Sequence, residues 1–100
     1  MPASLSEALD TLRSHEAELR GLGVSHASIF GSVARGEAAG SSDIDVLVEL
    51  DPGFSLGLYE YSRLKLRIAE MFGGSADVVN RKTLKPLLKQ AILDGAVNAF

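Results

Sequence analysis

The segment at residues 44–50, IDVLVEL, limits most narrowly what this chain can fold into. It is rich in β-branched and apolar residues, and the turn sequence Asp-Pro-Gly follows it at residues 51–53, so it predicts a strand that ends at residue 50. Alternation along a strand divides the side chains into an apolar set of Ile44, Val46 and Val48 and a second set of Asp43, Asp45, Leu47 and Glu49. The segment therefore predicts a sheet with one apolar face and with two carboxylates at the start of the other.

Helical periodicity and turn residues divide the remainder of the chain. Ser4 and Glu7 have the spacing of a capping box ahead of a periodic segment, which predicts a helix start. The patterns predict helices over about residues 5–20, 56–72 and 83 or 84–95, a helical turn at 32–35, and further strands at 24–30 and 75–80. We expect one α+β domain over residues 1–100: a small mixed β-sheet of three to four strands with helices packed against it.

Composition excludes several classes of protein. The chain has 100 residues, 46% of them hydrophobic, a net charge of −3 and no cysteine. These values favour a folded globule without disulfides or thiolate metal sites, and the mild acidity argues against direct nucleic-acid binding. No apolar run is long enough to span a membrane. The start, MPASLSEALD, lacks the pattern of a secretory signal, so we expect a cytoplasmic protein that does not bind membranes.

Two aspartates at the start of the central strand are candidate metal ligands. Asp43 and Asp45 are two residues apart, so their backbones would lie about 6.5–7 Å apart on one face of the strand. Carboxylate oxygens favour hard cations such as Mg²⁺, and two such ions are the usual arrangement for phosphoryl or nucleotidyl transfer. Asp77, on a neighbouring predicted strand, could reach the same ions or accept a proton from an attacking hydroxyl. Ordinary turn chemistry at a strand start would also explain the pair.

The Gly31-Ser32 pair is a candidate phosphate site. It follows the predicted strand at 24–30 and opens the helical turn. Glycine lets the backbone approach a ligand closely, and the N–H groups at a helix start favour anions. The alternative is that Gly31 is only a turn residue and Ser32 only a helix cap.

The combined motif resembles a known family. Gly31-Ser32, Arg35-Gly36 and Ser42-Asp43-Ile44-Asp45, with ten residues between Ser32 and Asp43, resemble the GS-x10-DxD pattern of the polymerase-beta-like nucleotidyltransferase superfamily. The resemblance covers most of the chain and is strongest to the minimal nucleotidyltransferase (MNT) proteins, which are typically encoded as antitoxins beside a HEPN-domain partner. The ending AILDGAVNAF is similar to the C-terminal helix of that family.

The resemblance implies a site and a reaction. Gly31 and Ser32 would hold the triphosphate of ATP, with Arg35 as a further phosphate contact or as an ion-pair partner of a motif aspartate. Asp43 and Asp45 would bind two Mg²⁺ ions, and Asp77 would complete the carboxylate set and activate the acceptor. AMP would be transferred from ATP to a tyrosine of the HEPN toxin, which is an RNase, and this modification would inactivate the toxin. Three alternatives stay open: a non-catalytic antitoxin that occludes the toxin, a small-molecule nucleotidyltransferase, and a small α/β domain without an active site.

Two further groups of residues are candidates for contacts with a partner. Arg81 and Lys82 follow the third predicted strand, where they form either a solvated loop end or a contact with a nucleotide or an acidic partner. Phe54, Leu56 and Leu58 follow the Asp-Pro-Gly turn and predict a partly exposed apolar patch that could bind a partner.

Overall fold

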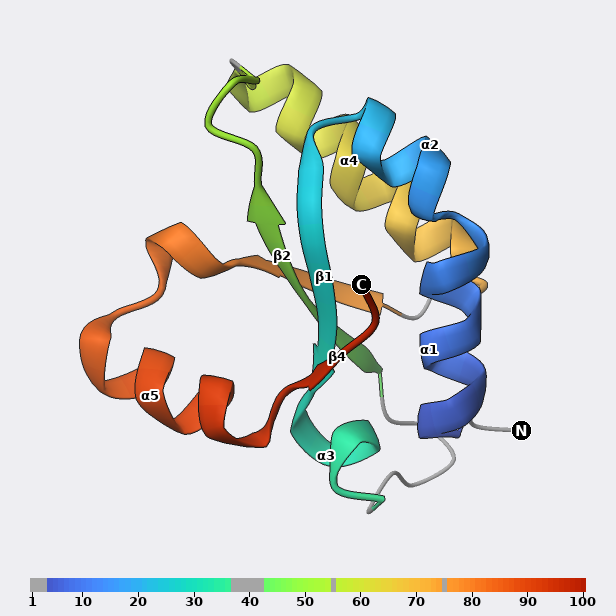
Figure 1. Ribbon diagram of the computed structural model, residues 1–100, viewed down its shortest axis with the longest axis vertical. Helices are drawn as coiled ribbons and strands as arrows, with labels where there is room; N and C mark the ends of the chain where they lie inside the picture. Colours follow the sequence, from blue (N-terminus) through green and yellow to red (C-terminus); the bar gives the residue numbers. More distant parts are fainter. Residues whose placement is uncertain (1–3, 37–42, 55, 75) are drawn as a thin grey trace.

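A mixed sheet lies at the centre of the computed structural model, which describes residues 4–36, 43–54, 56–74 and 76–100. Within these residues the sheet has four strands in the order β3-β2-β1-β4 (Figure 1). The strands are β1 (Val24–Phe30), β2 (Ile44–Leu50), β3 (Ala76–Asn80) and β4 (Val97–Asn98). β1 pairs antiparallel with both β2 and β4, whereas β2 pairs parallel with β3. The predicted α+β class with a small mixed sheet is therefore confirmed.

Helices cover the two faces of this sheet unequally. The helices are α1 (Leu5–Ser14), α2 (Glu16–Gly21), α3 (Gly31–Ala34), α4 (Leu58–Met71) and α5 (Pro86–Gly95), and a 3-10 turn, η1 (Arg81–Thr83), follows β3. Figure 1 shows α1, α2 and α4 on one side of the sheet and α5 on the other. Among the described residues, no helix combines the length and the apolar character needed to cross a membrane.

The hydrophobic core lies between the sheet and α1, α2 and α4. Its largest fully buried side chains are Leu12, Leu19, Val24, Ile29, Val46, Val48 and Ile68. The predicted alternation in β2 is confirmed, because Ile44, Val46 and Val48 belong to this core. Asp45 and Glu49 alternate with them and so lie on the opposite face, the open face, which carries α5.

The first predicted helix is correct at its start and wrong in its continuity. Ser4 Oγ accepts a hydrogen bond from the Glu7 backbone N–H at 3.2 Å, as the capping box predicts. The segment then forms two helices rather than one, because His15 has non-helical backbone angles (φ −106°, ψ 14°). The His15 ring Nδ1 lies 2.8 Å from the Thr11 carbonyl oxygen, and the His15 N–H donates instead to Leu12. The side chain thus takes the acceptor that a continuous helix would use.

The C-terminal segment also departs from the prediction. The helix begins at Pro86 rather than at residue 83 or 84, because Lys85 precedes proline and has extended backbone angles (φ −66°, ψ 143°). After α5 the chain is not helical, and β4 pairs with β1 through Ser28↔Asn98 and Ile29↔Val97. The loop predicted at residues 37–42 lies outside the described residues.

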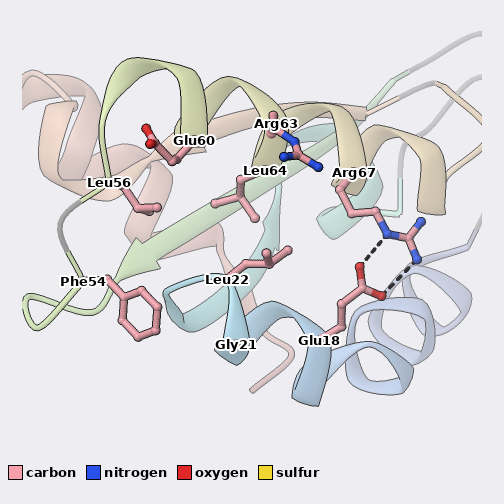
Figure 2. A pocket seen from close by; sticks show the side chains of 9 residues that line it. All are labelled: Glu18, Gly21, Leu22, Phe54, Leu56, Glu60, Arg63, Leu64 and Arg67. Carbon is pink, nitrogen blue, oxygen red and sulfur yellow. Dashed lines mark hydrogen bonds and ion pairs between the residues drawn. The ribbon is translucent and has the colours of Figure 1, made fainter.

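A cleft of about 390 Å³ opens between α2, α4 and the turn that carries Phe54 (Figure 2). Phe54 and Leu56, from the predicted apolar patch, line it together with Leu64. At one end of the cleft, the Arg67 guanidinium donates to both carboxylate oxygens of Glu18, at 2.5 and 2.9 Å. This hydrogen bonding lowers the pKa of Glu18. The pair joins α2 to α4 across the edge of the core.

The buried core side chains should dominate the stability of the fold. Leu12 is fully buried, so Leu12→Ala leaves a cavity and should lower the free energy of unfolding by about 2–5 kcal/mol. Urea denaturation followed by circular dichroism measures this change. The matched control is Leu87→Ala, since Leu87 is 91% exposed, and its effect should stay within about 0.5 kcal/mol. Equal losses for the two variants would contradict this location of the core.

Candidate active site

The strand register brings the two halves of the sequence motif together. Phe30, the last residue of β1, lies opposite Asp45 of β2, so the chain enters Gly31 directly beside the Asp45 side chain. Gly31 has φ +75°, a left-handed conformation that glycine adopts without steric cost. The chain turns there and begins α3 within one residue.

Glycine is required at position 31 for a second reason, which is the space around Asp45. A Cβ atom added at Gly31 would overlap the Asp45 carboxylate oxygen Oδ2. Gly36 also has a positive φ, of +72°, but a Cβ there would meet nothing within 4 Å. Of the described glycines with a positive φ, Gly31 is the one whose added Cβ would meet a carboxylate. This close packing places the start of α3 against the aspartate of the next strand.

Ser32 and Arg35 lie at the two ends of this short helix. Ser32 occupies the first turn of α3, where backbone N–H groups have no acceptor within the helix. Arg35 follows the last helical residue, and its N–H donates to the Gly31 carbonyl at 3.2 Å. The Arg35 charge reaches Asp45 and acts to lower the pKa of that carboxyl. Anion-favouring groups thus lie on one side of Asp45.

The three predicted aspartates lie within electrostatic range of one another. Asp45 and Asp77 are register partners in the parallel pair β2–β3, and neighbouring strands lie about 4.8 Å apart. Asp43, exposed, precedes β2. The pKa of Asp45 is raised, first by burial of the carboxylate and then by the negative charges of Asp77 and Asp43. Ionised together, these groups repel one another.

The donor set suits a hard cation, although it is not assembled as a metal cage. Among the described residues, no group of three Asp, Glu, His or Cys side chains is arranged to hold a metal ion. The available donors are carboxylate oxygens, which Mg²⁺ prefers, and their mutual repulsion is what a bound cation would relieve. Asp43 and Asp77 are exposed and Asp45 is half-buried, so the carboxylates are accessible from the open face.

Farther along the open face lies a pair that the sequence analysis did not link. Arg81 Nη1 donates to Glu49 Oε2 at 3.1 Å. The sequence spacing could have predicted this pair. Glu49 lies four residues after Asp45, and Arg81 lies four residues after Asp77. A shift of four residues along both of two parallel strands keeps the face and the register. Between the two pairs, Leu47 is only 4% exposed. Leu47 is apolar and alternates with Asp45 and Glu49, which indicated that another part of the chain covers this face in part.

Comparison with known proteins gives a consistent family. The model of the nucleotidyltransferase domain family matches residues 8–98. A protein of Methanocaldococcus jannaschii, provisionally named a protein adenylyltransferase, is 47% identical over 78 residues, covering 78% of this chain and 82% of its own. Protein adenylyltransferase MntA of Thermococcus cleftensis is 33% identical over 91 residues, with 90% of each chain covered.

Solved structures agree with this family. One described provisionally as a minimal nucleotidyltransferase matches with a TM-score of 0.75 and 35% identity over 95% of each chain. A toxin–antitoxin structure with AMP-PNP matches with a TM-score of 0.70 and 20% identity, over 88% of this chain and 72% of the other. A complex of tri-AMPylated Shewanella oneidensis HEPN toxin with MNT antitoxin matches with a TM-score of 0.64 and 17% identity, over 92% and 71% of the two chains. Family match, relatives and fold agree, and the chain belongs to the nucleotidyltransferase domain family and is a nucleotidyltransferase.

Proposed function

We propose that this chain is a Mg²⁺-dependent antitoxin that transfers AMP from ATP to a tyrosine hydroxyl of a cognate HEPN RNase toxin and so neutralises it. The observation that carries the proposal is the packing of Gly31 against Asp45, with Asp77 in register beside it. That packing brings the turn after β1 and the carboxylates of β2 and β3 to one point. The relative named protein adenylyltransferase MntA and the structure of an AMPylated HEPN toxin with its antitoxin support the choice of AMP and of a protein acceptor.

The turn after β1 would bind the triphosphate. Gly31 allows close approach of the backbone, and the N–H groups of the first turn of α3 and the Ser32 hydroxyl would donate to phosphate oxygens. Arg35, whose charge already reaches Asp45, would contact phosphate from the end of α3. These groups would place the α-phosphate next to the carboxylates.

The carboxylates Asp43, Asp45 and Asp77 would hold Mg²⁺ through their oxygens. Bound there, the metal would supply charge neutralisation of the phosphates and of the leaving group. The raised pKa of Asp45 is a property of the metal-free chain and reflects burial and the repulsion from Asp77 and Asp43. Three anionic groups held in this way favour binding of a cation at this end of the sheet.

The chemistry is one in-line displacement at the α-phosphorus of ATP. The tyrosine oxygen forms a bond to the α-phosphorus, and the bond from that phosphorus to the oxygen bridging to the β-phosphorus breaks. Pyrophosphate leaves with the bonding electron pair. Asp77, exposed on the open face, would accept the proton of the hydroxyl. AMP remains on the acceptor as a phosphodiester.

Replacement of Asp45 tests the carboxylate set. Asp45→Asn removes a metal ligand and should lower AMP transfer to the HEPN protein by at least about 100-fold, measured with ATP labelled at the α-phosphate. The same variant should melt at a higher temperature than wild type in EDTA, because it removes the carboxylate that burial and repulsion disfavour.

The matched control is Asp10→Asn on α1, on the other side of the sheet from α5, which should leave both transfer and melting temperature unchanged. Full transfer by Asp45→Asn would contradict the proposed mechanism. If that variant still rescues cells from the toxin at native expression, neutralisation acts through binding alone.

Replacement of Gly31 tests the packing between turn and carboxylate. Gly31→Ala would strain a left-handed residue and push its Cβ into Asp45, so AMP transfer should fall about 10-fold or more. Gly73→Ala is a close control, because Gly73 has a similar φ of +70° but nothing within 4 Å of an added Cβ. Both variants should lose roughly 1 kcal/mol of stability to the left-handed strain. Gly31→Ala should lose somewhat more through its contact with Asp45, and only Gly31→Ala should lose activity. Equal loss of activity would argue against a special role for Gly31.

Metal removal gives a third test. Transfer should stop in EDTA and return with excess Mg²⁺, and Mg²⁺ without nucleotide should raise the melting temperature of the wild type by ligand linkage. Differential scanning fluorimetry measures the shift. Asp45→Asn should show a smaller shift or none. A magnesium shift that is the same in both proteins would place the cation elsewhere.

A further inference from the structure

Helix α5 is unusual among the helices of this fold, because none of its residues is buried. Leu87 is 91% exposed and Leu88 is 56% exposed, although a helix of a globular protein normally buries its apolar stripe. The helix contacts α3 and β1 and otherwise extends away from the core (Figure 1). It therefore presents apolar side chains that nothing in the described chain covers.

The same segment carries a concentration of positive charge. Residues 81–93 contain Arg81, Lys82, Lys85 and Lys89, which are four of the ten basic residues of the chain, and no Asp or Glu. Arg81 is paired with Glu49. The lysines remain beside the exposed leucines, in a chain whose net charge is −3. Apolar residues flanked by lysines fit a partner surface that is apolar with acidic residues around it.

The position of α5 relative to the carboxylates suggests which partner this is. A hollow of about 420 Å³ separates Leu93 and Ala96 from Leu47 and Ser28 of the sheet, and a second, of about 590 Å³, is lined by Lys89, Lys82 and Arg81. The first hollow lies on the open face, to which Asp45 and Asp77 also belong, and the second extends from Glu49 toward the turn after β2. Opposite this face, α1, α2 and α4 are packed on the core. With that face covered, the open face that carries α5 is a side from which a protein acceptor reaches the carboxylates.

We propose that the α5 surface, formed by Lys85, Leu87, Leu88 and Lys89, is the docking surface for the acceptor protein. The acceptor binds it with an apolar patch bordered by carboxylates, and this contact holds the acceptor hydroxyl over Asp45 and Asp77. The inference rests on the proposed function, since it assumes a protein acceptor for the transfer of AMP. In this proposal α5 binds the acceptor and takes no part in the chemical step.

The test separates docking from chemistry by steady-state kinetics. In Leu87→Glu, the KM for the cognate HEPN-domain acceptor protein should rise about 10-fold or more. The KM for ATP and the kcat at saturating acceptor should stay within about twofold, because the variant does not touch the site. Leu87 is nearly fully exposed, so the fold tolerates the change, which circular dichroism verifies. The control is Leu66→Glu on α4, 65% exposed on the opposite side of the sheet, which should leave all three constants unchanged.

Charge is tested separately with a double variant. Lys85→Gln with Lys89→Gln should raise the KM for the acceptor and weaken its dependence on salt, since the wild-type contact loses attraction as ionic strength rises. An unchanged KM in both α5 variants overturns the proposal. An equal rise of the acceptor KM in Leu87→Glu and Leu66→Glu also overturns it. A change from dimer to monomer in Leu87→Glu with an unchanged KM overturns it as well, and would make this surface a contact between copies of the chain.

Failure of the proposed function is distinguishable from failure of the docking surface. If the wild type binds the HEPN-domain protein in calorimetry but transfers no AMP, the enzymatic proposal fails, and loss of binding in Leu87→Glu still supports the surface. If the wild type transfers AMP and Leu87→Glu does so with an unchanged KM, the surface fails and the activity stands.

Discussion

The central strand β2 is the constraint on which the rest of the structure depends. It is hydrogen-bonded on both edges, antiparallel to β1 and parallel to β3, so its register cannot slip without breaking two ladders. A slip of one residue would also move Val46 and Val48 out of the core and place Asp45 inside it. Burial of the valines therefore determines the face of the sheet on which Asp45 lies. Pairing with β1 determines its position along the strand, which is next to Gly31. Stability of the core and position of the site have one cause.

The site has a cost that the rest of the fold must offset. Asp45 is half-buried beside Asp77 and Asp43, and its raised pKa means that the ionised folded state is disfavoured. The sign follows directly: a carboxyl whose folded-state pKa lies above its unfolded value makes folding less favourable as pH rises through that range. Among the described residues, Arg35 is the group that acts in the opposite direction on the pKa of Asp45. A bound cation would remove the repulsion, so the charge arrangement disfavours the empty site and favours the occupied one.

The sequence allowed prediction of those features that local rules govern. The bounds of β1 and β2 followed from composition and turn residues, the alternation in β2 followed from its period of two, and the start of α1 followed from Ser4. The break at His15 depends on a side chain that takes the Thr11 carbonyl, and β4 spans two residues that only pairing with β1 defines. Neither leaves a periodic signal. The spacing of the sequence motif predicted Gly31 and Asp45 as site residues. Their contact depends on the register between β1 and β2, which the sequence does not show.

The incomplete cover of the open face follows from what that face carries. A helix packed tightly across Asp45 and Asp77 would bury both carboxylates further, raise the cost of their charge, and close the approach for an acceptor. The chain therefore covers this face only in part: Leu47 is buried, while α5 stands over hollows and leaves Leu87 exposed. In a 100-residue chain with a small core, such exposed apolar area contributes little to stability until another protein covers it. The architecture that keeps the carboxylates accessible is the same one that leaves α5 available to a partner.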